Sequence, residues 1–259
     1  MTIALALAFG AVIGILLGLL GGGGSIMAIP ALVYALGLDF EQAVLIALIV
    51  IAIASAVGAI PKVLIKQVNW RLAGVFAVAG IPATFAGSAI GDRLPQTAIM
   101  VGFAVVMIVA GIRMLADADA DDTGGACEIA EGGINWRRCA PRSLPVAVVV
   151  GLLTGLFGVG GGFLIIPALV IMLGVEMPIA VGTSLLIITA NSTAGIASHA
   201  QDATINWSLT ATFVGTAVVG SLIAGQLGTK LDNTRLQRWF AYLVFIVAAY
   251  VLIDTLLLH

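Results

Sequence analysis

Long hydrophobic runs with few charged residues alternate with short polar segments along the chain. Charges, glycines and prolines bound the runs, which is the pattern of consecutive helices in an apolar surrounding. In the first half of the chain they cover about residues 3–20, 25–37, 41–66, 70–91 and 97–116. All but the second have about the 20 residues that a membrane-spanning helix needs. The second has 13 residues, which as a helix would extend about 20 Å and fall short of a hydrocarbon core of roughly 30 Å.

A glycine cluster separates the first two runs, and glycine there predicts a break between two helical segments. We expect the runs 3–20 and 25–37 to form either a pair of short helices or a re-entrant hairpin. In both cases the chain returns to the side of the membrane from which it came. The first run lacks the basic start and the small-residue cleavage site of a signal peptide, so we expect it to be retained.

The pattern of the first half recurs in the second half. A shift of 137 residues aligns 14–117 with 151–254 without a gap, and 31 of the 104 residue pairs are identical. Apolar composition alone would not make glycines, prolines and the pairs Asn69-Trp70 and Asn206-Trp207 coincide. The sequence therefore predicts two copies of one membrane unit, at 1–117 and 143–259, joined by a polar linker at 118–142.

The orientation of the two copies depends on the first two runs. If these runs return together, the three spans that follow place the second copy upside down relative to the first, whereas a single broken span would make the copies parallel. Cytoplasmic loops carry an excess of Lys and Arg. The inverted arrangement leaves only Arg93 on the other side, while the parallel one splits the cations seven to four. We therefore predict inverted repeats, both termini outside and the linker in the cytoplasm. The cations collected on one side are Lys62, Lys66, Arg71, Arg113, Arg137, Arg138, Arg142, Lys230, Arg235 and Arg238.

Composition narrows the class of protein. Of the 259 residues 61% are hydrophobic and 9% are charged, against about 25% charged residues in a soluble domain, so we predict an all-α polytopic membrane protein. A net charge of -2 without a basic stripe excludes a nucleic-acid binder. The polar segments are too small for a catalytic domain, so no enzyme is expected.

The two cysteines lie together in the linker. Cys127 and Cys139 lack the spacing and partners of a zinc site, and we expect neither a metal nor a cofactor. They form either a disulfide or free thiols, and free thiols fit a cytoplasmic linker.

Both glycine clusters also carry candidate chemistry. In lipid an unpaired backbone N–H group is costly, so a break is tolerated only where protein, water or a ligand pairs with it. Helical segments begin directly after each cluster, and their N-terminal N–H groups and dipole ends favour an anion. Alternatively, the glycines serve only close helix packing. The candidate substrate-binding residues of the clusters are Gly21, Gly22, Gly23, Gly24, Ser25, Gly158, Gly160, Gly161 and Gly162.

The counterpart of run 41–66 in the second copy is the most polar span. Ser184, Asn191 and Ser198 are seven residues apart and share one helical face. Ser192 matches Ser55 across the repeat, and we add Ser55, Ser184, Asn191 and Ser192 to the candidate substrate-binding residues. Neutral donors suit the lining of an anion cavity, although Ser and Thr also bond back to their own helix. No Asp or Glu lies in the interior of the spans, which argues against a carboxylate relay or a carboxylate-based metal or sodium site at the membrane midplane.

Lys62 and His199 are equivalent in the repeat and end their spans. As coupling or gating groups they would attract an anion at each mouth, or His199 would carry a coupling proton. The alternative is that Lys62 is a positive-inside anchor and His199 an interfacial polar residue. Trp70 and Trp207 fall at expected membrane interfaces and suit an aromatic belt.

Inverted repeats with short, glycine-interrupted segments at matching positions are typical of secondary transporters. At these residues the sequence resembles the TauE/SafE family of sulfite- and sulfonate-exporter membrane permeases. The resemblance rests on the signature G-x-x-G-x-G-G-G/S-x-x-x-x-P-x-L at Gly18–Leu32 and Gly155–Leu169 and on the two Asn-Trp pairs. It covers nearly the whole chain except the linker.

The resemblance implies a secondary transporter that exports sulfite, sulfoacetate, other sulfonates or organic anions by alternating access, coupled to the proton gradient. The expected location is a bacterial-type inner membrane. The expected partners are the small anion and the lipid bilayer, and a homodimer stays open. A passive anion channel would use the same donors and differ in conductance, and a non-transporting sensor or scaffold is a further alternative. An intramembrane hydrolase would have only Ser25 and His199 as its reactive pair, without a third orienting group.

Overall fold

The fold is built from helices. The computed structural model describes residues 2–91, 93–118, 129–130, 133–134, 136–157, 162–199, 207–228 and 232–257. Apart from one hairpin of two-residue strands, the regular elements there are helical, and seven helices are long and apolar enough to cross a membrane. The prediction of an all-α polytopic membrane protein is confirmed.

In the described residues each half contains five helical segments, and in each half the second segment is short and ends as a π-helix (η). In the first half they are α1 (Thr2–Leu20), α2 (Gly23–Pro30) with η1 (Ala31–Ala35), α3 (Phe40–Leu64), α4 (Trp70–Gly91) and α5 (Gln96–Ala118). In the second half they are α6 (Trp136–Phe157), α7 (Gly162–Pro167) with η2 (Ala168–Met172), α8 (Met177–His199), α9 (Trp207–Gly228) and α10 (Asn233–Leu257).

The two halves share helix boundaries. A shift of 137 residues carries α4 onto α9 and η1 onto η2 residue for residue. The π-helices also end alike, because Gly37 and Gly174 have φ angles of 67° and 65°. The next residue then donates its N–H group back, Leu38 to the Leu32 carbonyl at 3.3 Å and Val175 to the Leu169 carbonyl at 2.9 Å. Glycine is required there, since the left-handed conformation costs other residues about 1 kcal/mol or more.

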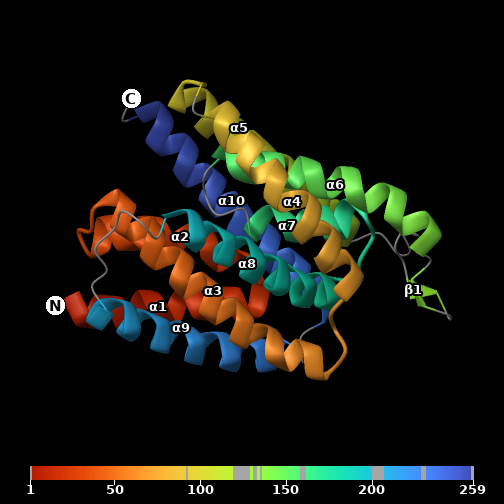
Figure 1. The fold of residues 1–259 in the computed structure, drawn as a ribbon, viewed down its shortest axis with the longest axis horizontal. Helices are drawn as coiled ribbons and strands as arrows, with labels where there is room; N and C mark the ends of the chain where they lie inside the picture. The colour runs from red at the N-terminus through yellow and green to blue at the C-terminus, as the bar shows by residue number, and fades with distance from the viewer. Residues whose placement is uncertain are drawn as a thin grey trace.

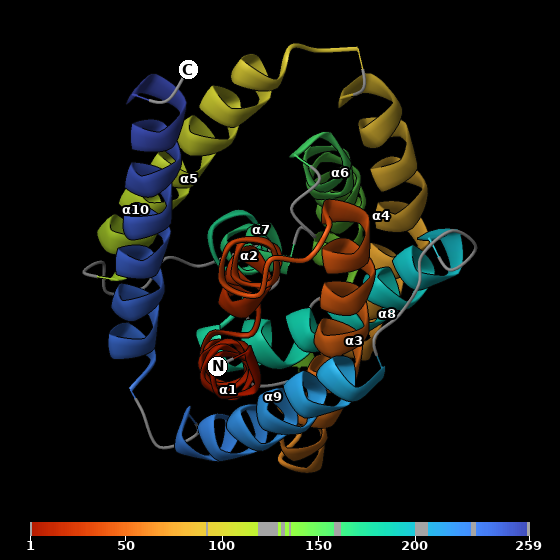
Figure 2. The same ribbon diagram turned by 90° about the vertical axis from the view of Figure 1, so that its left-hand side faces the viewer.

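The halves interlock rather than stand side by side. The most extensive helix contacts join α1 with α9, α4 with α6 and α5 with α10, each pair taking one helix from each half. The short helices α2 and α7 contact each other as well, and Figure 2 shows both end-on in the middle of the molecule. Figure 1 shows the start of α1 and the end of α10 at one end of the long axis, with the α3–α4 connection and the start of α6 at the other.

Equivalent helices run antiparallel where they touch. Leu48, early in α3, packs on Gly195, late in α8, while Lys62, late in α3, lies against Gly182, early in α8. In the same sense the Gln237 amide, early in α10, donates to the carbonyl of Met114, late in α5, at 2.9 Å. By contrast, α1 and α9 run parallel, with Gly14 on Ala217 and Gly18 on Ser221.

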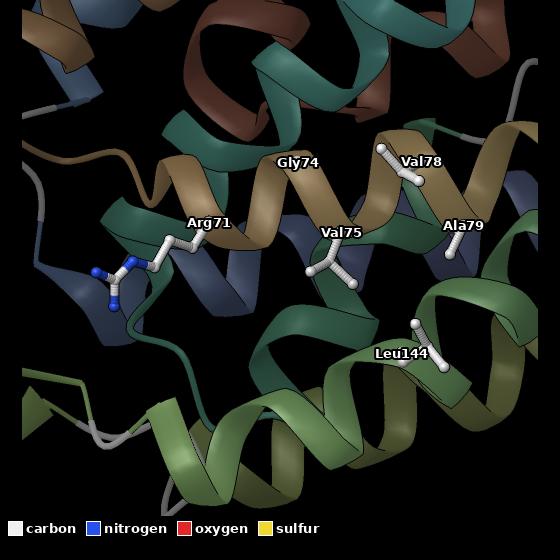
Figure 3. A pocket seen from close by; sticks show the side chains of 6 residues that line it. All are labelled: Arg71, Gly74, Val75, Val78, Ala79 and Leu144. Atoms are coloured by element: carbon white, nitrogen blue, oxygen red, sulfur yellow. The ribbon is translucent and has the colours of Figure 1, made fainter.

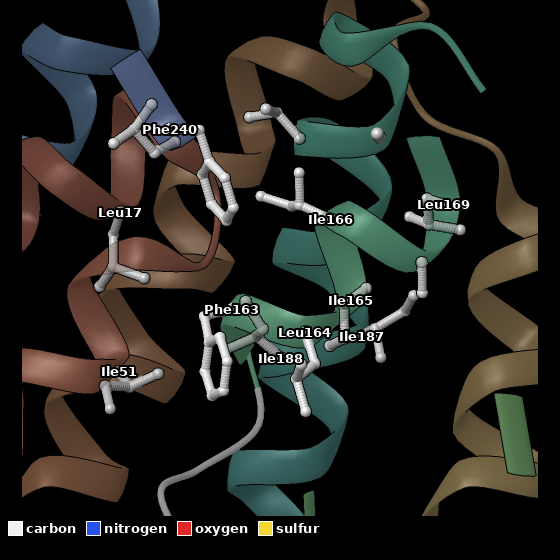
Figure 4. Close-up of a cluster of buried hydrophobic side chains, with 14 of the residues drawn as sticks. Leu17, Ile51, Phe163, Leu164, Ile165, Ile166, Leu169, Ile187, Ile188 and Phe240 are labelled. Atoms are coloured by element: carbon white, nitrogen blue, oxygen red, sulfur yellow. The ribbon is translucent and has the colours of Figure 1, made fainter. Parts of the chain in front are cut away.

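The apolar core surrounds the second short helix. All six residues of α7 are buried, and side chains from α1, α3, α8 and α10 lie around it (Figure 4). Phe163 makes an edge-to-face contact with Phe103 of α5 at a ring-centroid distance of 5.1 Å. The position of α7 is therefore fixed by contacts with both halves.

The helices extend into both sides of the segment that the sequence predicts as a linker. Helix α5 continues to Ala118 and α6 begins at Trp136, with the hairpin of β1 (Ile129–Ala130) and β2 (Gly133–Ile134) between them. Cys139, near the start of α6, is buried and disulfide-bonded. Of the two states that the sequence left open, the disulfide is the one observed for Cys139, and Cys127 lies outside the described residues.

Candidate substrate site at the helix breaks

The first chain break meets the start of α7 inside the bundle. The break between α1 and α2 packs its Gly22 directly on the backbone of Gly162, the first residue of α7. The Ser25 hydroxyl also faces Gly162, where an added Cβ would lie 2.9 Å from Oγ. We call Gly21–Ser25 together with Gly162 the break crossing. Gly158, Gly160 and Gly161 lie outside the described residues.

The glycines of the first cluster lie close to their neighbours. A Cβ on Gly21 would lie 2.6 Å from the Ser184 hydroxyl, and one on Gly23 would lie 2.6 Å from a methyl of Leu243. A Cβ on Gly24 would overlap the backbone of α1. Gly21 also has a φ of 65°, which turns the chain out of α1. The packing function that the sequence left as an alternative is therefore present at these positions, independently of any ligand.

Two of the candidate hydroxyls bond to their own backbone. Ser25 Oγ donates to the Gly22 carbonyl at 2.7 Å, and Ser184 Oγ donates to the Val181 carbonyl at 2.8 Å. These hydroxyl protons are therefore occupied, although the oxygens keep lone pairs. The N–H groups of Gly23 and Gly24, at the start of α2, have no hydrogen-bond partner among the residues that the structure describes.

Two other candidates have polar atoms that are buried without a partner. Within the described residues, Ser55 Oγ and Asn191 Oδ1 are shielded from solvent and accept or donate no hydrogen bond. Ser55 is 0% exposed, and the neighbouring candidate Ser192 is also buried. A buried polar atom without a partner costs about 1–3 kcal/mol. Such a cost is a reason to look for a ligand.

These unpartnered atoms lie at the level of the break crossing. The contacts of Leu48 with Gly195 and of Lys62 with Gly182 place the middle of α3 beside the middle of α8. Ser55 is thereby at about the level of Ile188, and Asn191 follows Ile188 by less than one helical turn. Ile188 in turn is the side chain nearest to a Cβ on Gly162, at 2.8 Å. The crossing and both polar atoms thus share one layer of the bundle.

The Lys62 side chain does not extend to the surface of the bundle, as a snorkelling anchor would. Its side chain is 1% exposed, and its ammonium donates to the Gln67 amide oxygen at 3.3 Å. Its repeat equivalent His199 is the last residue of α8, and its side chain lies outside the described residues. Trp70 and Trp207 are 63% and 69% exposed on the outside of the bundle, as an aromatic belt requires.

A cross-half hydrogen bond near Lys62 was not predictable from the sequence. The backbone N–H of Asn69, after α3, donates to the Thr183 hydroxyl in α8 at 3.0 Å. The bond joins residues 114 positions apart. Thr183 is polar in an apolar span, which is the one signal that sequence reasoning could have used.

An open groove lies on the outside of the bundle, away from the break crossing. Figure 3 shows it between α4 and α6, with Arg71 at one end and Leu144 on the facing helix. The rest of its lining is apolar or glycine, from Gly74, Val75, Val78 and Ala79. Such a surface fits contact with lipid chains and does not belong to the candidate site.

Interlocked apolar helices, with a short broken helix from each half at the centre, are typical of a polytopic membrane protein of the transporter type. Residues 6–251 match the model of the family described as sulfite exporter TauE/SafE. The chain therefore belongs to the TauE/SafE family, and the resemblance predicted from its sequence is confirmed.

Similar proteins carry transporter names. A "probable membrane transporter protein" of Xylella fastidiosa is 32% identical over 249 residues, which cover 94% of this chain and 92% of the relative. The "probable membrane transporter protein YunE" of Bacillus subtilis is 25% identical over 262 residues, covering 95% and 94%. A third relative, the "probable membrane transporter protein MJ0441" of Methanocaldococcus jannaschii, is 35% identical over 116 residues, 42% of each chain. The protein is a membrane transporter of this family.

Proposed function

We propose that the protein exports small sulfur-containing or organic anions, such as sulfite, sulfoacetate or other sulfonates, by alternating access coupled to the proton gradient. The observation that carries this proposal is the contact of the first chain break with the start of α7, in one layer with two unpartnered polar atoms. The N–H groups of Gly23 and Gly24 at the start of α2, for which the described residues offer no partner, favour a negative group, as does the positive end of the helix dipole. Ser55 and Asn191 would complete the site.

The antiparallel contacts support inverted repeats. Helices α3 and α8, and likewise α5 and α10, are related by the repeat and run in opposite directions. Two halves of opposite orientation can exchange conformations, which lets one protein face either side of the membrane at small energetic cost. We accordingly propose that 1–117 and 143–259 are the two moving halves, joined by the segment 118–142.

Lateral contacts also bring the ends of α3 and α9 and the starts of α4 and α6 to the same end of the bundle, where the sequence has most of its cations. Gly58, near the end of α3, packs on Ser221 near the end of α9, and Arg71 at the start of α4 shares a groove with Leu144 near the start of α6. We propose that this cation-bearing end faces the cytoplasm of a bacterial-type cell and that both termini face outside.

The membrane potential favours export of an anion. One charge that crosses the membrane gains about 2.3 kcal/mol per 100 mV when an anion leaves a negative interior. Exchange with an entering proton adds the energy of the pH gradient. The membrane potential and the proton gradient therefore both act in the direction of export.

Flux measurements on proteoliposomes test the proposal. We expect saturable uptake of radiolabelled sulfite, sulfoacetate or taurine, which an imposed pH gradient accelerates. Gly22→Ala should reduce the flux at least about tenfold, because its Cβ would overlap Gly162 and hold the break crossing apart. Gly215→Ala is the matched control, since an added Cβ on Gly215 meets nothing within 4 Å.

The outcomes separate the candidate functions. Saturable flux of at least one anion supports a transporter, and single-channel conductance far above carrier turnover would identify a passive channel. No saturable flux of any of the three anions, with folded protein in the vesicles, would contradict the proposal.

A further inference from the structure

Lys62 is a buried cation for which the fold supplies no described counter-charge. Its side chain is among the largest of those that are less than 2% exposed. Its observed partner is the neutral Gln67 amide, and among the described residues the one ion pair seen is Arg235 with Asp232 on the surface. A buried ammonium without an anion is strongly destabilising. An ionisable residue inside a membrane span is therefore expected to have a function in binding or transport.

The surroundings of Lys62 hold the side chain in place. Its Cβ lies 3.1 Å from the position of a Cβ on Gly182, and the Gln67 carbonyl packs on the same glycine. The Gln67 N–H group donates back to the Lys62 carbonyl at 2.8 Å. Together with the bond from Asn69 to Thr183, these contacts clamp the end of α3 onto the second turn of α8.

The same turn of α8 leads to the break crossing. Gly182 contacts Lys62, while the adjacent Val181 and Ser184 contact Gly21, where a Cβ would lie 3.1 Å from Val181 Cα and 2.6 Å from Ser184 Oγ. The Lys62 side chain therefore starts beside the same turn of α8 that contacts the first chain break. Its ammonium bonds to Gln67, in the connection from α3 to α4.

We propose that Lys62 is an anion-recognition residue, whose ammonium pairs with the negative head of the substrate on its way between the cation-bearing end and the break crossing. The inference rests on the proposed anion transport and makes it more specific, because it requires a charged sulfonate, sulfite or carboxylate head. Neutral analogues of the same shape are excluded, since they would leave the ammonium buried without a counter-charge. Arginine would keep the interaction and glutamine would remove it.

The test combines transport with binding on the full-length protein. In proteoliposomes we expect Lys62→Gln to raise the half-saturation concentration for sulfite by about tenfold or more and Lys62→Arg to change it less than about threefold. Lys66→Gln, four residues further on and exposed, is the matched control and should behave as wild type. Equal half-saturation in Lys62→Gln and wild type would overturn the proposal and leave anion transport standing.

A thermal measurement keeps the two proposals distinguishable. Without anion, Lys62→Met should melt about 3 °C above wild type, because it removes a buried uncompensated charge. Sulfite should stabilise wild type and not Lys62→Met, whereas dimethyl sulfone, a neutral analogue, should stabilise neither. Stabilisation that depends on Lys62 in a protein without flux would support the recognition site and contradict transport. A lower melting point of Lys62→Met, with unchanged stabilisation by sulfite, would show that Lys62 is structural only.

Discussion

Lys66 holds a backbone conformation that lysine seldom adopts. Its φ is 58°, and it is the non-glycine residue with positive φ among those the structure describes. Its N–H donates to the Val63 carbonyl at 3.0 Å and that of Gln67 to the Lys62 carbonyl at 2.8 Å, which together form the C-terminal motif that usually contains glycine. The bend after α3 is therefore made at a conformational cost.

We expect Lys66→Gly to stabilise the protein by about 0.5–1 kcal/mol, because glycine adopts the left-handed conformation without strain. Lys66→Ala, which removes the charge and keeps the Cβ, serves as the comparison and should give no such gain. The free energy of unfolding in detergent micelles measures both. A gain of equal size in Lys66→Ala would assign the effect to charge instead of backbone.

The unpartnered atoms of Ser55 and Asn191 give a second prediction at this scale. Ser55→Ala and Asn191→Leu should raise the free energy of unfolding by about 1–2 kcal/mol each, since each removes a buried unsatisfied atom. Both should also weaken the binding of the transported anion by about tenfold. Thr212→Val is the control, because the exposed Thr212 hydroxyl bonds to its own helix at the Ser208 carbonyl. Improved stability with unchanged anion affinity would remove both residues from the site.

The polar candidates show where sequence reasoning reached its limit. The repeat pairs Ser55 with Ser192, and composition alone marked Ser184 and Asn191 as unusual in an apolar span. Rotamers decide which hydroxyl turns back to its own carbonyl, as Ser25 and Ser184 do, and periodicity carries no information about them. The bond from Asn69 to Thr183 depends on two segments 114 residues apart, so only the fold could disclose it.

At the scale of elements, helix boundaries follow the hydrophobic pattern closely. The run predicted at 70–91 is α4, and the short second run became α2 with η1. The π-helices were not predicted, because a change from α to π hydrogen bonding leaves the apolar run uninterrupted. Helix α6 starts earlier than the apolar run, since Trp136 and the basic residues after it are compatible with a helix that extends beyond hydrocarbon.

Glycines at helix contacts determine how closely the halves approach. Gly14 of α1 packs on the backbone of Ala217 in α9, and the equivalent contact of Gly151 in α6 is with Gly80 in α4. Gly14→Ala should lower the free energy of unfolding by about 1–3 kcal/mol, because the helices would have to separate. Gly74→Ala, whose Cβ meets nothing within 4 Å, should be neutral or stabilising by up to about 1 kcal/mol. Equal effects of the two substitutions would show that this contact is not tightly packed.

At the scale of the whole molecule, the interlocked contacts predict that neither half is stable alone. Because α1 lies along α9 and α4 along α6, each half lacks its main partners without the other. Residues 1–124 and 125–259, co-expressed as separate chains, should assemble and co-purify, and each alone should be degraded in the membrane. A half that accumulates alone in a protease-resistant form would contradict this prediction.

The orientation in the membrane is testable with two single cysteines. In a chain without native cysteines, Arg93→Cys should react with a membrane-impermeant maleimide on intact cells, and Lys66→Cys only after permeabilisation, because they lie at opposite ends in the proposed topology. Both positions are exposed outside the helices, so the two reactions are comparable. The orientation also determines the redox state expected of the native cysteines, since a disulfide at Cys139 would be reduced in a cytoplasm. The reverse labelling pattern would invert the proposed topology and place that disulfide in an oxidising compartment.

The direct contact of Gly22 with Gly162 has a consequence for how tightly a solute can be held. No molecule fits between two backbones in contact, so anything that enters there must first wedge the halves apart. Part of the binding free energy is used to separate the halves, so the observed affinity is weaker than the individual contacts alone would give. Binding of the solute and separation of the halves then occur in one step. A solute that is too small, or that binds too weakly to separate them, would not start the conformational change.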